Sequence, residues 1–454
     1  MYIRKRAVSN KKDNISGIIK MMKDCKMHLL KYLKKTKIRG IFLLICCMIA
    51  HLMISGCVTV GPDYVLPETR LPEKWHNELK GEGTGDVHDS PRLAGWWRTL
   101  NDSTLSAIID RAVVNNQDIR KARAKIREQR ARRNISYAGL FPTLDASGSF
   151  TRRKGSEDTG GGKETDFYST GFDAGWELDL FGGTRRLVEA STADLQAIQE
   201  DLRDVLVSLL AEVALNYVEV RSFQARIEVA EKNLDIQNES YQLAQFRYQA
   251  GLANEFAVHQ AKYNLENTRS SIPALRAALE EAMNRLAVLM GDNPGTVHAE
   301  LEEQKPFPVG RPDFAVGIPA DVLRQRPDIR RAERQLAAQT ARIGAATADL
   351  YPNVNLTGSI GFESLTLDNL ITSGSRIYSF GPRITWPIFK AGSILSNIEV
   401  QTALQEQSLI QYETALLNAL EEVENALVAY MEEQNRRQSL IDAKRAASQA
   451  AALA

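Results

Sequence analysis

Few residues of this chain have the types and spacing that chemistry at a site requires. The six histidines, His259 and His298 among them, show no metal-ligand spacing. The stretch Gly160-Gly161-Gly162-Lys163 departs from the phosphate-binding loop pattern, because Glu157 and Glu164 stand where that pattern needs a glycine and a hydroxyl residue. We therefore expect a protein that is not an enzyme and that uses no metal or cofactor.

One acidic group has a regular spacing. Asp173, Glu177 and Asp179 alternate with apolar residues, so in a β-strand all three side chains point to the same face. A catalytic carboxylate pair is one interpretation of them. The strict alternation favours a different one, a strand with a polar face that lines water. We predict that these three residues, with Arg383 on a later strand, line a lumen.

Cys57 has the most specific predicted chemistry. It follows a basic segment, an apolar run at 41–54 and the small residues of Ile54-Ser55-Gly56. These features are typical of a secretory signal, and the last four residues resemble a lipobox, whose cysteine is acylated. We predict a signal peptide at 1–56 and a covalent lipid on Cys57, with an incidental cysteine as the alternative. The residue after this cysteine is Val58 and not the aspartate that retains lipoproteins at the inner membrane, which favours sorting to the outer membrane.

Composition excludes some further classes. The chain has 454 residues, of which 44% are hydrophobic and 25% charged, so it can bury a core. Its formal net charge of +1 gives no basic surface for a polyanion, and we expect no nucleic-acid partner. The other three cysteines all precede Cys57, so the mature chain has no internal disulfide.

The sequence contains an internal tandem repeat. Asp118 recurs as Asp328 and Pro142 as Pro352, and both pairs give the same offset, since 328 minus 118 and 352 minus 142 are each 210. Each copy predicts a helix, two strands around a loop, and a very long helix. The first helix runs from Asp102 or Ser103 to about Tyr137. The predicted strands lie at 143–152, 167–180, 353–362 and 376–388.

Each predicted strand has an apolar face, a polar face and aromatic residues near its ends, which favours a membrane barrel over a soluble sandwich. Four strands cannot close, and an open edge in lipid leaves unpaired backbone groups. The barrel must therefore be shared between subunits. Two subunits give eight strands with a filled interior, whereas three give twelve and a lumen, which favours a trimer.

Two long helices follow the first strand pair. The region 184–249 contains no proline or glycine and, at 1.5 Å per residue, is roughly 100 Å long. Its apolar residues recur with coiled-coil spacing. Gly251 breaks the pattern, a second helix returns over about 254–290, and Pro273 should break or kink it. The predicted domains are an extended anchored segment at 57–100, the first repeat at 101–290, a connector at 291–319 and the second repeat at 320–454.

With these features the chain resembles the TolC-like outer membrane factors, specifically the NodT-type lipoprotein branch. The most specific stretches are Gly317-Ile318-Pro319-Ala320-Asp321, Arg326-Pro327-Asp328-Ile329 and Leu350-Tyr351-Pro352. The resemblance implies a mixed α and β membrane protein, in which a trimeric transmembrane β-barrel with four strands per subunit continues into a long periplasmic coiled-coil α-barrel. It also implies a location in the outer membrane and the periplasm.

The resemblance further implies partners and a role. Such channels are homotrimers that meet a periplasmic adaptor, the membrane fusion protein, and an inner-membrane resistance-nodulation-division (RND) pump, as passive exit ducts for small molecules. By this resemblance Tyr248, Gly251 and Leu252 are candidate adaptor contacts at the hairpin tip; a simple helix cap and turn is the alternative.

The chain departs from the family pattern at one point. The offset of 210 maps residue 454 onto 244, so the second copy has no counterpart of its tip and returning helix, which predicts a fragment or a truncated gene. Two other functions stay open: a type I protein secretion duct, and a lipid-anchored structural coiled coil without a pore.

Overall fold

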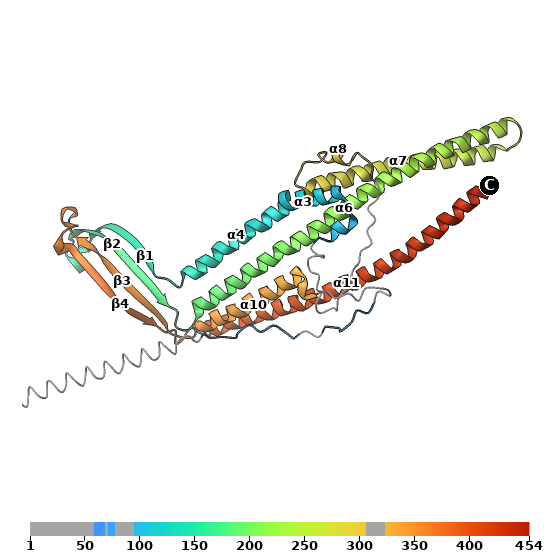
Figure 1. Ribbon diagram of the computed structural model, residues 1–454. Coiled ribbons are helices and arrows are strands. Elements are labelled where there is room, and N and C mark those ends of the chain that lie inside the picture. The colour runs from blue at the N-terminus through green and yellow to red at the C-terminus, as the bar shows by residue number, and fades with distance from the viewer. Residues whose placement is uncertain (1–58, 69–70, 78–94, 306–322, 454) are drawn as a thin grey trace, which may run out of the picture. The chain divides into compact units, whose positions relative to one another are not determined.

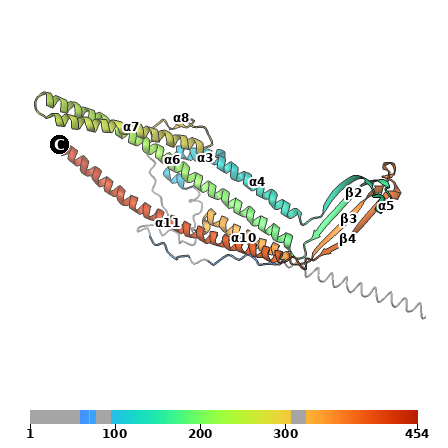
Figure 2. The ribbon, with the colours of Figure 1, turned by 180° about the vertical axis from the view of Figure 1, so that it is seen from behind.

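The computed structural model describes residues 59–68, 71–77, 95–305 and 323–453. The chain divides into two compact units. One contains residues 145–183 and 351–387, which form the strands, and the other contains residues 61–144, 184–350 and 388–454, which form the helices. This division separates the body of the sheet from the long helices and cuts across both predicted repeats. Figures 1 and 2 show the elements from opposite sides.

The strand unit is one four-stranded sheet in the order β1-β2-β3-β4. The strands are β1 (Thr143–Lys154), β2 (Glu164–Leu178), β3 (Asn353–Ser364) and β4 (Arg376–Thr385). β2 pairs antiparallel with β3, and β3 with β4. The predicted end of β4 at 388 is wrong, because β4 ends at Thr385.

The helical unit begins with the 3-10 helix Trp96–Leu100 and with α3 (Ser103–Asn115) and α4 (Gln117–Ala138). The single predicted helix over 102–137 is therefore wrong. Asn116 divides it: the Asn116 side chain accepts from the backbone N–H groups of Asp118 and Ile119 and donates to the Leu289 carbonyl at 2.8 Å. A side chain that satisfies the first N–H groups of a helix starts a new helix at that point.

The long helices are α6 (Gly183–Gln249), α7 (Glu255–Leu289) and α11 (Ser393–Leu453). α6 and α7 form an antiparallel hairpin (Figure 1). α7 is continuous through Pro273, so the predicted break does not occur. Contacts to α6 flank the proline, Asn233 with Thr268 and Arg276 with Glu231, and buried Ile272 precedes it. Tertiary contacts here outweigh the local cost of proline.

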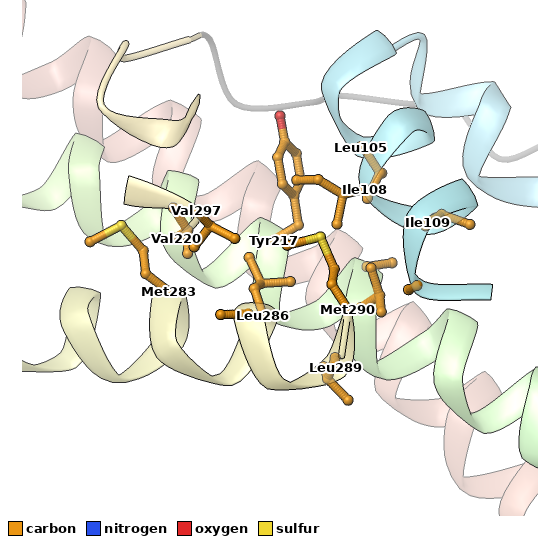
Figure 3. Packing of buried hydrophobic residues seen from close by; sticks show 14 of the residues in the cluster. Leu105, Ile108, Ile109, Tyr217, Val220, Met283, Leu286, Leu289, Met290 and Val297 are labelled. Atoms are coloured by element: carbon orange, nitrogen blue, oxygen red, sulfur yellow. The ribbon is translucent and has the colours of Figure 1, made fainter. Parts of the chain in front are cut away.

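The main core joins α3, α6 and α7. Leu105, Ile108, Tyr217 and Leu286 are fully buried there, and Figure 3 shows them packed together with Met290 and Val297. A second cluster joins α10 (Pro327–Ala348) to α11 through Ile329, Tyr412 and Leu416. The predicted connector contains the short helix α8 (His298–Leu301); its residues from 306 onward lie outside the described residues.

The repeat is visible in the elements. α4 and α10 each have 22 residues, β1 and β3 each have 12, and in both cases the two elements begin at positions one repeat apart. Asn116 before α4 corresponds in the same way to Arg326 before α10. The two copies therefore share local structure as well as sequence.

Candidate functional site

The sheet brings three of the predicted lumen residues onto one face. Asp173 on β2 lies opposite Ser359 on β3, and Glu177 lies opposite Asn355. Asn355 in turn lies opposite Arg383 on β4. Because residues directly opposite one another share a face, Asp173, Glu177 and Arg383 project from the same side of the sheet.

That side carries a layer of hydrogen bonds between strands. The Ser147 hydroxyl donates to an Asp173 carboxylate oxygen at 3.0 Å, and an Asn353 amide N–H donates to the Glu177 carboxylate. Hydroxyl pairs join neighbouring strands, Ser149 with Ser169 at 2.9 Å and Ser359 with Ser379 at 2.8 Å. These groups leave further donors and acceptors exposed, so the polar face suits contact with water.

The fourth predicted residue is placed differently. β2 ends at Leu178, two residues before the predicted end, and Asp179 follows the strand. The alternation that assigned Asp179 to the polar face therefore does not reach it. The lumen-lining role of Asp173, Glu177 and Arg383 stays a prediction.

The opposite face of the sheet is apolar and uncovered by the described residues. Phe380 is 84% exposed, Ile384 68% and Ile360 65%. Phe150 and Tyr168 pack on each other there, with ring centroids 4.8 Å apart. An apolar patch of this kind marks a surface that contacts a membrane or a protein.

The α6–α7 turn has a defined geometry. Gly251 has φ +73°, in the left-handed region. Its N–H donates to the Tyr248 carbonyl at 2.9 Å, and the Leu252 N–H donates to the Arg247 carbonyl at 2.8 Å. This pair of bonds is a Schellman cap, which ends a helix with glycine in the left-handed region. Asn254 then starts α7 by accepting from the Ala257 N–H.

The same turn gathers exposed apolar side chains. Leu252 is 72% exposed and Tyr248 46%, and the structure adds two residues that the sequence prediction missed, Phe246 at 65% and Phe256 at 72%. The sequence does contain a signal for these two residues, because both phenylalanines lie within a few residues of Gly251. We define Phe246, Tyr248, Leu252 and Phe256 as the tip patch; its contact role stays a prediction.

Ile54, Ser55, Gly56 and Cys57, with the whole predicted signal peptide, lie outside the described residues. The chain is described from Thr59, and its next residues make specific contacts. The Arg186 guanidinium, almost fully buried, donates to the Gly61 carbonyl and, at 2.7 Å, to Asp63. The Tyr64 hydroxyl donates to Glu333 on α10 at 3.2 Å. The segment that follows the predicted lipid site is thus fastened to the helical unit.

A buried polar network was not predicted. Asp102, which caps α3 through the Thr104 and Leu105 N–H groups, also accepts from the Tyr217 hydroxyl at 2.6 Å. Arg221 is 1% exposed and donates to Tyr217 and to the Glu303 carbonyl. Burial and the hydrogen bond to Asp102 raise the pKa of Tyr217 to about 12. The network fixes the start of α3 and the residues after α8 against α6.

Two other kinds of site are absent from the part of the chain that the structure describes. There, no three His, Cys, Asp or Glu side chains are grouped so as to hold a metal ion. Within the same residues, no helix is long and apolar enough to span a membrane.

Comparison with known families gives a match over most of the chain. The model of the outer membrane efflux protein family matches residues 108–292 and 318–454. The chain belongs to this family. The resemblance inferred from the sequence motifs is therefore confirmed.

Individual members of the efflux family agree with this assignment. Nodulation protein T of Rhizobium leguminosarum bv. trifolii is 33% identical over 84% of this chain and 80% of its own length. The cation efflux system protein CusC of Escherichia coli K12 is 32% identical over 83% of this chain and 81% of its own. The solved structure of the outer-membrane channel OprN is similar with a TM-score of 0.79 and 36% identity, and covers 87% of this chain and 88% of its own.

These comparisons confirm several of the predictions. The chain has the mixed α and β fold of the trimeric outer-membrane efflux channels. It is an outer-membrane channel protein of efflux, as predicted. The relatives are channel proteins and not enzymes.

Proposed function

We propose that three copies of this efflux-family chain form a passive exit duct of a tripartite system. The observation that carries the proposal is the sheet, which has one polar face, one apolar face and two outer strands, β1 and β4. Such a sheet in lipid needs further strands, because unpaired backbone groups there cost several kcal/mol each. Three copies supply twelve strands, enough for a water-filled lumen lined by Asp173, Glu177 and Arg383.

The proposed partners are a periplasmic adaptor and an inner-membrane RND pump. Support comes from the tip patch, where four large apolar side chains are exposed beside a rigid cap. Exposed apolar groups that project from a fixed backbone are typical of a protein contact surface. We place the adaptor contact at Tyr248, Gly251 and Leu252, together with Phe246 and Phe256.

We further propose that a lipid on Cys57 anchors each subunit. The short segment that begins at Thr59 is held in place because the buried Arg186 guanidinium donates to the Gly61 carbonyl and to Asp63. A lipid two residues before Thr59 would hold this end of the chain at the membrane surface. The anchor acts together with the strands. We propose no other cofactor.

The proposed cargo is small molecules, and the choice among them lies with the pump. The polar face carries two acidic residues, Asp173 and Glu177, and one basic residue, Arg383, so it is not selective for cargo of one charge sign. The described residues also form no cluster that could hold a metal ion. CusC is named for cation efflux, and that name alone does not transfer a cargo to this chain. We propose no enzymatic activity.

The test is transport in cells from which the gene is deleted. We expect a fluorescent amphiphilic dye such as ethidium to accumulate severalfold more than in the parent, and reintroduction of the gene to restore the parental level. Secreted polypeptides should be unchanged. Unchanged dye with loss of a secreted polypeptide would instead support a type I secretion duct. Loss of envelope integrity without either effect would support a structural coiled coil.

A further inference from the structure

A cavity of about 580 Å³ lies in the helical unit between α6, α7 and the short helix α8. Four apolar side chains line it: Ile227, Leu279, Met283 and Leu301. Three of them are buried, and Leu279 packs against the main core. Small-molecule sites are typically cavities of roughly 300–1,000 Å³ with mostly apolar walls and a few polar groups. The cavity therefore has the size and the apolar floor of such a site.

The α8 side of the cavity is fixed by polar contacts. The buried Gln224 side chain on α6 donates to the Leu301 carbonyl at 2.6 Å. From α7, a Glu280 carboxylate oxygen lies 2.6 Å from the His298 ring nitrogen Nε2 and accepts a hydrogen bond from it. The buried polar network around Arg221 holds the residues after α8 in the same way. A ligand would meet a preformed site, so little of its binding energy would be lost in ordering the protein.

The rim of the cavity has an excess of negative charge. Glu280 and Glu302 both line the cavity and are exposed. Arg276 lines it as well, but its guanidinium donates at 2.7 Å to Glu231, which does not belong to the lining. A carboxylate outside the cavity thus already balances this arginine. A cleft with carboxylates and apolar walls raises the local concentration of cations.

We propose that this cavity binds an amphiphilic organic cation. The apolar part of the ligand lies on Leu279, Met283 and Leu301, and its charged group lies near Glu280 and Glu302. The ligand contacts α7 and the segment after α8 together, so it stabilises the attachment of that segment to the α6–α7 hairpin. None of the residues proposed for the lumen or the tip patch belongs to this site. It is therefore a second site, and it does not depend on the proposed duct.

Other classes of ligand fit the cavity less well. A bare metal ion needs several ligating side chains, and within the described residues no three His, Cys, Asp or Glu side chains are grouped to hold one. A metal ion would also gain nothing from the apolar floor, which contributes only to a ligand with apolar surface. An anionic amphiphile would gain from the floor but would be repelled by the two carboxylates.

Ethidium is a suitable probe, because it is an aromatic cation whose fluorescence increases when it leaves water. The full-length channel in a nonionic detergent is titrated with the dye, and the signal of the detergent alone is subtracted. We expect one saturable site per subunit and a higher thermal midpoint of the channel at saturating dye. Absence of a saturable site would overturn the proposal.

Two double variants test the carboxylates. Glu280→Gln with Glu302→Gln removes both rim charges, and glutamine keeps an acceptor for His298. Glu281→Gln with Glu303→Gln is the matched control, because it changes the net charge equally at exposed neighbouring residues that do not line the cavity. We expect the rim variant to bind ethidium roughly three- to tenfold more weakly, the effect of losing two partly exposed charge pairs. The control should bind as the unmutated channel does.

Equal ethidium affinities of the two double variants would overturn the proposal. Binding would then depend on the net charge of the protein alone, or on no carboxylate at all. Dye export by cells that carry these variants tests the duct separately, so the cavity can fail this test while the proposed channel function stands.

A larger side chain tests the floor of the cavity. Leu279→Trp fills part of it and should weaken ethidium binding roughly tenfold. Leu275→Trp is the matched control, since Leu275 is also half-buried, lies one turn earlier on α7 and does not line the cavity. Native mass spectrometry and the thermal midpoint show whether each variant still forms the channel, and the charge variants decide if Leu279→Trp does not fold. Equal affinity of two folded tryptophan variants would show that the dye binds elsewhere.

Discussion

Replacing Gly251 by valine tests whether the tip needs its left-handed backbone. Gly251 has φ +73°, and an added Cβ would meet nothing within 4 Å. A substitution therefore causes no clash, and any effect comes from the backbone conformation. Two hydrogen bonds depend on that conformation, from Gly251 to Tyr248 and from Leu252 to Arg247.

The expected magnitude follows from the left-handed conformation. For residues with a Cβ this region costs roughly 1–2 kcal/mol, and a β-branched side chain such as valine is among the least tolerant. Since every 1.4 kcal/mol is a factor of ten, the closed cap should open roughly 5- to 30-fold more often. Gly251→Asn should change much less, because asparagine is enriched in this region.

Hydrogen exchange measures the opening directly. We expect the Leu252 amide of the Gly251→Val channel to lose protection by that factor, and capture of the proposed periplasmic adaptor to weaken in parallel. Gly295→Val is the matched control: Gly295 has φ +95° and equally open surroundings but lies outside the α6–α7 turn. It should alter neither quantity.

Two results would refute this reasoning at different steps. Unchanged protection at Leu252 would show that the cap does not need glycine. Lost protection with undiminished adaptor capture would show that the tip patch is only a turn, and the adaptor contact would have to lie elsewhere.

Three further predictions concern the anchor and the helical core. Cys57→Ser should abolish metabolic labelling with radioactive palmitate, and persistent label would remove the anchor. Leu286→Ala, at a fully buried position, should destabilise the subunit by about 2–5 kcal/mol, visible as a lower thermal midpoint, whereas Leu243→Ala, at a position 58% exposed, should change it little. Burial and the bond to Asp102 raise the pKa of Tyr217 to about 12, so its contribution to stability is present below the unfolded pKa near 10 and is lost as pH rises through 12. Between these two pH values the thermal midpoint of the unmutated protein should fall, and Tyr217→Phe should make that fall smaller. The exposed Tyr263→Phe variant should behave like the unmutated protein. Parallel curves of thermal midpoint against pH for the unmutated protein and both variants would refute a stabilising role of the Tyr217 hydroxyl.

The repeat made much of this fold predictable. Period-two alternation located all four strands, and a repeated sequence with one offset predicted two equivalent halves. Strand ends were less accurate, because β2 ends at Leu178 and β4 at Thr385, where single backbone hydrogen bonds are lost. Such bonds leave no periodic signal.

The break at Asn116 was predictable and was missed. Its counterpart precedes Pro327, and proline at the first helical position marks a helix start. The same offset carries that start to Gln117. The repeat thus predicts helix boundaries as well as motifs.

The buried Arg221 could not be predicted. Its partners are Tyr217 and Gln224, within one helical turn, and the Glu303 carbonyl, 82 residues away in sequence. A periodic pattern assigns an arginine to a solvated face, since buried charge is costly. Only the folded arrangement supplies the acceptors that make this burial possible.

The ion pairs of the helical unit do not follow the repeat. Arg331 on α10 donates to Asp201 and Asp204 on α6, and Arg342 donates to Asp194. The positions one repeat after these three aspartates, on α11, are Leu404, Gln411 and Thr414.

The ion pairs therefore belong to one helix joint and are not copied to its counterpart. Backbone geometry follows the repeat because strand pairing uses groups that every residue has, whereas side-chain chemistry has diverged. The three corresponding positions on α11 carry no acidic side chain, so the second copy has no equivalent ion pairs there.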